Sequence, residues 1–113
     1  MSKQILGPTF EEMLHPNTIA PAIRARALAA RTQDPLDPIN LFNITWRDGN
    51  NNIYYHVMPK ELTGTDANIV VLYGKDFPSG SHKVGAAYSV LIEKQSFGEV
   101  DPSTHTLVWP STG

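Results

Sequence analysis

The residues best suited to chemistry stand together in the stretch 80–83, which reads GSHK, and small residues follow at 85–87. Lys83 falls at the predicted start of a helix, beside that helix's apolar face. The N-terminal end of a helix carries partial positive charge, and an apolar setting desolvates a charged group, so both disfavour the ammonium form. A neutral lysine amine is a nucleophile toward carbonyl carbon. The position therefore favours covalent chemistry at Lys83, and the alternative is an ordinary surface lysine.

Other kinds of site fit the sequence less well. A phosphate-binding loop of the G-x-x-x-x-G-K-[ST] type needs its lysine directly after glycine and then a hydroxyl residue, whereas Lys83 comes two positions too late and Val84 follows it. The four histidines do not have the spacing of metal ligands: His15, His56, His82 and His105. Cysteine is absent, which excludes disulfides, thiolate metal sites and cysteine nucleophiles. We therefore expect no metal site, and Asp76 is expected at most to help order the loop before Lys83.

The first elements that must position this stretch are a helix and a hairpin. Apolar residues at positions 19, 23, 27 and 30 fall on one helical face, and the prolines within 34–38 end the pattern. We therefore expect a helix over 18–32, preceded by an irregular arm. Two β-prone runs, 41–46 and 53–57, flank a turn rich in glycine and asparagine and predict a β-hairpin.

The second half of the chain predicts a βαβ unit. Residues 68–73 form an apolar run without alternation, which is typical of a strand buried on both faces. An amphipathic pattern predicts a helix over 82–95 with Ser81 as its cap, and 106–109 is expected to be another strand. In this order the elements would form a right-handed crossover between two parallel strands. The expected fold class is α/β.

The composition limits the classes of partner. The chain has 113 residues, of which 41% are hydrophobic, and a formal net charge of -2. This composition is typical of a folded domain, and the charge balance gives no basis for a nucleic-acid partner. No apolar run reaches the roughly 18 residues of a membrane helix, so we expect no membrane partner. We also expect no signal peptide, and the absence of cysteine fits a reducing cytoplasm.

The expected sheet would be incomplete. A parallel pair ending at 106–109 would have too little cover for its two faces. We therefore expect this chain to be the N-terminal part of a larger folded unit, with the remainder supplied as a second chain. The alternative is a complete 113-residue α+β domain with a frayed end.

Residues 80–83 and the small residues after them resemble the cofactor-lysine motif of fold-type II pyridoxal phosphate enzymes. The form with histidine before lysine is similar to that of tryptophan synthase beta subunits. The tail 109–113, which reads WPSTG, resembles the start of the carboxylate-binding loop of cysteine synthases, threonine synthases and serine dehydratases. The order of strand, loop, lysine helix, strand and STG loop agrees with this family over 68–113, whereas 1–67 carries no family motif.

The resemblance implies a role for each matched residue. Lys83 would form the Schiff base with pyridoxal 5'-phosphate and carry the substrate Cα proton, and His82 would lie close to the cofactor phosphate. Ser111, Thr112 and Gly113 would begin the loop that binds the amino-acid carboxylate. The family's next asparagine, its glycine-rich phosphate loop and its partner of the pyridine nitrogen are not among these 113 residues. A complete site would therefore need the C-terminal remainder of the enzyme.

The resemblance predicts a lyase or transferase that acts on an amino acid by β-elimination, β-replacement or synthase chemistry. Indole chemistry is not expected, because Trp109 and Pro110 stand where a catalytic glutamate would precede the loop. We expect residues 1–40 to be an arm and helix and 41–113 to be the N-terminal part of the cofactor-binding α/β fold, in a homo-oligomer. The alternatives are a non-catalytic or regulatory subunit that retains the fold and a stand-alone binding module.

Overall fold

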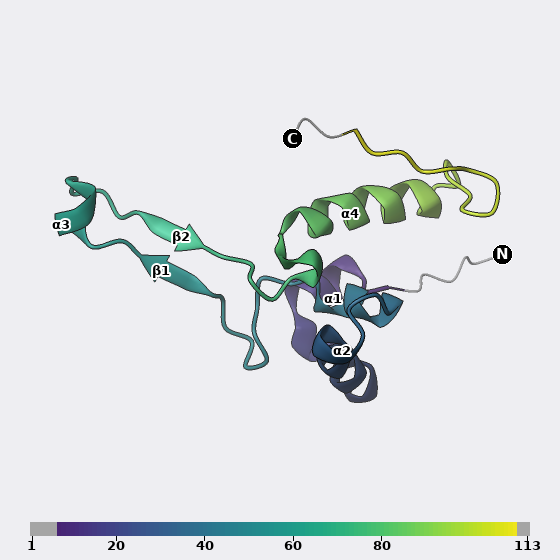
Figure 1. Cartoon of the computed structure of the whole chain (residues 1–113), viewed down its shortest axis with the longest axis horizontal. Helices are drawn as coiled ribbons and strands as arrows, with labels where there is room; N and C mark the ends of the chain where they lie inside the picture. Colours follow the sequence, from purple (N-terminus) through teal and green to yellow (C-terminus); the bar gives the residue numbers. More distant parts are fainter. Residues whose placement is uncertain (1–6, 111–113) are drawn as a thin grey trace.

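The computed structural model describes residues 7–110 and places them in two parts (Figure 1). One part is a helical unit, and the other is a two-stranded ribbon that extends away from it. The Cα radius of gyration is 16.9 Å and the extents are 57 × 36 × 25 Å. A compact domain of this length would have a radius of gyration of about 13 Å. The chain is therefore elongated, because the ribbon stands clear of the helices.

The expected irregular arm contains a short helix, α1 (Phe10–Leu14). A capping box starts it: Thr9 Oγ1 accepts a hydrogen bond from the Glu12 N–H at 3.1 Å, and Glu12 Oε1 accepts one from the Thr9 N–H at 3.0 Å. A single 3₁₀ turn, η1 (Pro16–Thr18), leads from α1 to the next helix.

The helix expected over 18–32 is confirmed as α2 (Pro21–Gln33). It begins later than expected, because Pro21 occupies the first turn, where its missing N–H costs no helical hydrogen bond. Ala27 and Ala30 are buried on the face that the apolar periodicity indicates.

The hairpin expected between 41–46 and 53–57 is wrong in its first strand. Residues Pro38–Asn43 form a 3₁₀ helix, η2, instead. The Asn43 side chain is buried, and its amide donates to the Ala27 carbonyl at 2.8 Å. This hydrogen bond ties the segment to α2, so a β-prone composition is overridden by tertiary contact.

The turn of the expected hairpin does form. Asp48 Oδ1 accepts a hydrogen bond from the Asn52 N–H at 2.9 Å, and this closes the loop 48–52. Arg47 and Ile53 make an isolated antiparallel bridge across it. Strand pairing does not extend beyond that bridge.

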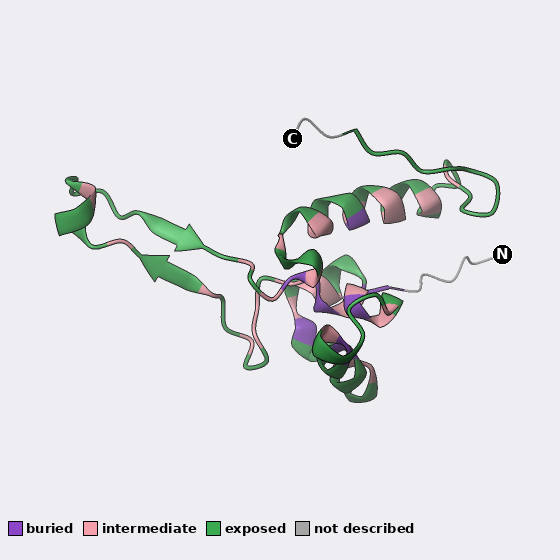
Figure 2. Cartoon of the chain, viewed as in Figure 1, coloured by how far each residue is buried: buried purple, intermediate pink, exposed green. Residues whose placement is uncertain are grey.

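The ribbon pairs β1 (Tyr55–Val57) with β2 (Val70–Leu72) in antiparallel register, and α3 (Lys60–Thr63) lies at its tip. The cross-strand partners are Tyr55 with Leu72, His56 with Val71 and Val57 with Val70. All six of these residues are exposed (Figure 2). A strand within 68–73 is thus confirmed, whereas the burial expected for it is not found in this chain.

The helix expected over 82–95 is confirmed as α4 (Lys83–Ser96). Tyr88 fixes α4 to the N-terminal segment, because its buried hydroxyl donates to the Pro8 carbonyl at 2.7 Å. Burial, and then the charge of Glu12, raise the pKa of Tyr88 to about 12.

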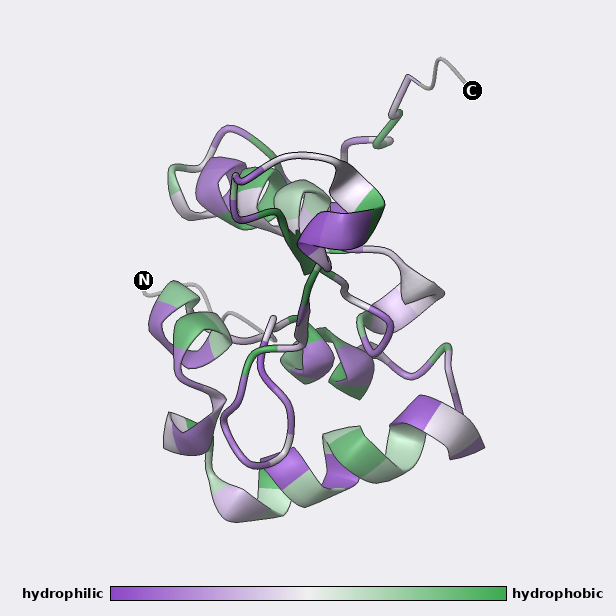
Figure 3. Cartoon of the chain, turned by 90° about the vertical axis from the view of Figure 1, so that its left-hand side faces the viewer, coloured by the Kyte–Doolittle hydropathy of each residue, from purple (hydrophilic) through white to green (hydrophobic). Residues whose placement is uncertain are grey.

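The core of the helical unit is small. Its buried cluster is Ile44, Phe77 and Tyr88, against which other apolar residues are partly buried: Met13, Leu41, Val84 and Ile92. In Figure 3 the helices carry both hydrophobic and hydrophilic positions, as expected of amphipathic helices. Among residues 7–110 no helix has the length and apolar character needed to cross a membrane.

The strand expected over 106–109 is wrong. These residues are exposed and lie outside the strands of the described chain, and Val108 is 81% exposed. An extended segment becomes a strand only beside a second backbone that takes its hydrogen bonds. The tail runs back along α4, apart from the ribbon that holds β2, its expected partner (Figure 1). Residues 7–110 therefore combine helices with one antiparallel pair and contain no parallel pair.

Candidate functional site

The segment 74–82 between β2 and α4, called the lysine loop below, is built from tight turns. The Phe77 N–H donates to the Gly74 carbonyl at 3.2 Å, and the Gly80 N–H donates to the Phe77 carbonyl at 2.9 Å. Within the 3₁₀ turn η3 (Pro78–Gly80), Ser79 and Gly80 both have positive φ, of 67° and 72°. Because Phe77 is buried, it anchors the loop in the core.

Lys83 is the first residue of α4 and is exposed. Its N–H donates to Ser81 Oγ at 3.3 Å. The prediction of Ser81 as the helix cap is wrong, because the N-cap position is His82, whose side chain makes no capping hydrogen bond. A Cβ added at Gly80 would meet nothing within 4 Å, so there is open space beside the loop. The amine is thus accessible to a carbonyl compound, whereas the desolvation expected for it is not supplied by the described residues.

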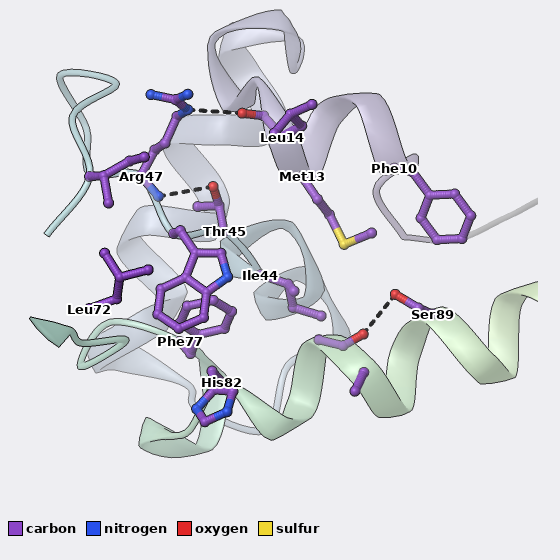
Figure 4. Close-up of a pocket in the computed structure, with 14 residues that line it drawn as sticks. Phe10, Met13, Leu14, Ile44, Thr45, Arg47, Leu72, Phe77, His82 and Ser89 are labelled. Carbon is purple, nitrogen blue, oxygen red and sulfur yellow. Dashed lines mark hydrogen bonds between the residues drawn. The ribbon is translucent and has the colours of Figure 1, made fainter. Parts of the chain in front are cut away.

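His82 lies against an aromatic cluster. Its ring centroid is 5.6 Å from that of Trp46, and the Trp46 ring meets Phe77 edge to face at 5.0 Å. All three side chains border an apolar cavity of about 530 Å³ (Figure 4). The cavity lies between α1, the segment after η2, and the first turns of α4.

The cavity brings together some of the predicted site residues and not others. His82, Gly85 and Ala86 border it, whereas Lys83 is not among its lining residues. A Cβ added at Gly85 would lie 3.4 Å from Cγ2 of Ile44. The absence of a side chain at Gly85 therefore lets α4 pack closely against Ile44. Gly85 therefore has a packing role here, and its predicted role beside a flat ligand stays a prediction.

The loop and the start of α4 contain groups of the kinds that the attachment end of pyridoxal phosphate would need. This cofactor needs an accessible lysine amine, room for a flat ring near the backbone and a donor toward its phosphate. Lys83 is exposed and could supply the amine, and there is open space beside Gly80 for a ring. The His82 imidazole is also exposed and could supply the donor. The predicted carboxylate-binding residues Ser111, Thr112 and Gly113 lie outside the described residues, so their role stays a prediction.

The sequence led us to expect that Asp76 helps to order the lysine loop, but it did not predict the partners of Asp76. Arg31 on α2 forms an ion pair with Asp76, with Nη1 and Oδ2 3.6 Å apart. A hydrogen bond to Asp76 is the main cause that raises the pKa of Tyr54. Lys75 Nζ lies 5.0 Å from the centroid of the Tyr54 ring. In the sequence, only the opposite charges of residues 31 and 76 hinted at this ion pair. Many other residues carry such charges, so the sequence gave no reason to pair these two.

A metal site is the other kind of site that histidines and carboxylates could form. Over residues 7–110 no group of three such side chains is arranged to hold a metal ion. His15 lies 3.8 Å from Glu11 in an exposed pair on α1 and its C-terminal flank, far in sequence from the lysine loop.

No protein-family model, no curated protein and no solved structure matches this chain. Its function must therefore be inferred from its own residues and their arrangement.

Proposed function

We propose that this chain is the N-terminal part of a pyridoxal-phosphate-dependent lyase or transferase that acts on an amino acid, with Lys83 as the residue that attaches the cofactor. The observation that carries the proposal is the position of Lys83, exposed at the start of α4, directly after the GSH of 80–82 and before small residues. When bound, the cofactor supplies an electron sink for negative charge at the substrate Cα.

Each matched residue has a task in this proposal. Lys83 Nζ would hold the cofactor at its aldehyde carbon and would carry the proton of the substrate Cα. His82 donates toward the cofactor phosphate. Residues 111–113 would bind the substrate carboxylate through hydroxyl and N–H groups.

The exposed ribbon supports a second part of the fold. Val57, Val70 and Leu72 are 48%, 51% and 53% exposed. The unbroken apolar run of β2 is the pattern of a strand that is covered on both faces, although its pairing here is antiparallel. We propose that the C-terminal remainder of the enzyme, as a second chain, completes the α/β fold on this ribbon. It would also cover Lys83 and so desolvate its amine, and the complete enzyme would be a homo-oligomer.

Cofactor attachment is the first prediction. The assembled protein is incubated with pyridoxal phosphate, reduced with borohydride and mapped by peptide mass spectrometry. We expect a pyridoxyl group on Lys83, because its amine is accessible at the start of α4. Lys83→Arg should abolish labelling, and Lys75→Arg is the matched control that should retain it.

Other outcomes contradict the assignment. A pyridoxyl group on Lys75 or Lys94 in place of Lys83 would overturn the proposed role of the motif. An assembled protein with no pyridoxyl group would favour the alternative, a non-catalytic subunit that retains the fold.

A further inference from the structure

The lysine loop is fixed to α2 and to the base of the ribbon at one place. Arg31 and Asp76 form the ion pair at 3.6 Å, and their side chains are only 37% and 32% exposed. Tyr54, just before β1, is linked to Asp76. Its ring lies against that of Tyr73, just after β2, with centroids 5.7 Å apart. Asp76 thus stands where the helical unit, the ribbon and the loop meet.

The α2 side of this junction carries excess positive charge. Burial, and then the charge of Arg31, lower the pKa of Arg24, so two guanidinium groups act on one another there. Nη1 of Arg24 and Nε of Arg31 are buried without a hydrogen-bond partner among the described residues. A carboxylate at position 76 offsets this charge, and partial burial strengthens the attraction relative to a fully exposed pair.

The position of Asp76 is transmitted to Lys83 through consecutive turns. Phe77, the next residue, is buried and accepts the Gly80 N–H at 2.9 Å. Ser81 then accepts the Lys83 N–H at 3.3 Å. Only six residues separate Asp76 from Lys83, and these turns leave no long flexible segment between the ion pair and the first residue of α4.

We propose that Asp76, held by its ion pair with Arg31, is a positioning residue that fixes the lysine loop and thereby presents Lys83 to the cofactor. The inference rests on the proposed function for the identity of the group that Lys83 meets. The anchoring of the loop by Asp76 does not depend on the cofactor, because it is argued from contacts within the chain. The anchoring and the presentation of Lys83 can therefore be tested separately.

Hydrogen exchange on the full chain tests the anchoring. We expect Asp76→Asn and Arg31→Gln each to speed amide exchange within 77–84 by about fivefold, because each removes the same partly buried ion pair. Arg31→Lys keeps the charge and should stay close to wild type. The double variant Arg31→Gln/Asp76→Asn should add little to either single change, because the two residues act as a unit.

The matched control is Glu99→Gln, which removes the exposed ion pair with Lys94 at the other end of α4, 3.1 Å long. It should leave exchange within 77–84 unchanged. Unchanged exchange in Asp76→Asn, or faster exchange spread evenly over α2 and α4, would overturn the anchoring role.

Pyridoxyl labelling tests the consequence for Lys83. In the assembled protein we expect Asp76→Asn to lower labelling of Lys83 severalfold at limiting cofactor, with Arg31→Lys restoring it relative to Arg31→Gln. Labelling unaffected by Asp76→Asn would overturn the positioning role. Wild-type protein without label on Lys83 would instead refute the proposed function, while the exchange result would still decide whether Asp76 anchors the loop.

Discussion

Two neighbouring residues of the lysine loop, Ser79 and Gly80, adopt left-handed backbone conformations with φ near 70°. For a residue with a Cβ this conformation costs about 1–2 kcal/mol, whereas glycine adopts it freely. The chain accepts that cost at Ser79, and the reversal it produces turns the backbone from β2 into α4. Gly80 is therefore required by the turn, independently of any ligand.

Replacing Gly80 tests that requirement. Gly80→Ala should lower the free energy of unfolding by about 1 kcal/mol, because the left-handed φ strains any Cβ. Steric contact plays no part, since an added Cβ meets nothing within 4 Å. Denaturant unfolding measures the change.

Gly49→Ala is the matched control for this prediction. Gly49 also has open space around an added Cβ, and its φ is not positive. The change there should stay within about 0.5 kcal/mol. Equal effects at Gly49 and Gly80 would show that backbone conformation does not set the stability of the lysine loop.

At the scale of elements, local patterns predicted what local forces determine. The periodicity of apolar residues gave α2 and α4 nearly to their ends, because one turn of a helix is set by neighbours three and four residues away. The β-prone runs indicated extended chain at 55–57 and 70–72, but both predicted pairings, of 53–57 with 41–46 and of 68–73 with 106–109, are wrong. Pairing depends on contacts distant in sequence, and β1 takes β2 in place of the segment near residue 44.

For the candidate site, too, the sequence predicted what depends on neighbouring residues and missed what depends on distant ones. Lys83 and His82 stand where the motif placed them, at the end of the lysine loop and the start of α4. The Asp76 ion pair was not predictable, because Arg31 comes from a helix early in the chain. The segment 106–109 failed in the opposite way. Its apolar composition predicted a strand, but the described chain provides no partner strand for it.

The ribbon is the element most open to an added strand. Its edges carry unpaired backbone groups, and the paired residues include no charged side chain that would discourage edge-to-edge association. We predict that Val70→Lys reduces self-association of the chain, as measured by analytical ultracentrifugation, without changing the thermal unfolding of the helices.

A second lysine substitution controls for the added charge. Leu36 is 92% exposed in a loop outside the ribbon, so Leu36→Lys should leave self-association close to wild type. An equal reduction by both variants would mean that net charge, and not the ribbon, controls association.

At the scale of the whole molecule, much apolar surface remains exposed outside the small core. The buried apolar side chains gather in the helical unit, whereas large apolar residues of β1, β2 and the tail are exposed (Figure 2). Soluble monomers rarely expose extensive contiguous apolar surface, so such surface marks a place where another part of a protein packs. The elongated shape follows from the same cause, because the ribbon has nothing to fold back against.

The last prediction concerns what covers this surface. The chain alone should bind a hydrophobic dye and aggregate as its concentration rises, because the faces and edges of the ribbon are uncovered. Addition of the second chain proposed above, the C-terminal remainder, should suppress dye binding and restore a cooperative thermal transition. Hydrogen exchange should then slow in β1 and β2, where new strands would pair, and change little in α2, whose buried face is already packed within the chain. A 113-residue chain that stays monomeric, binds no dye and melts cooperatively by itself would show that the ribbon needs no cover, and would remove the basis for a second part of the fold.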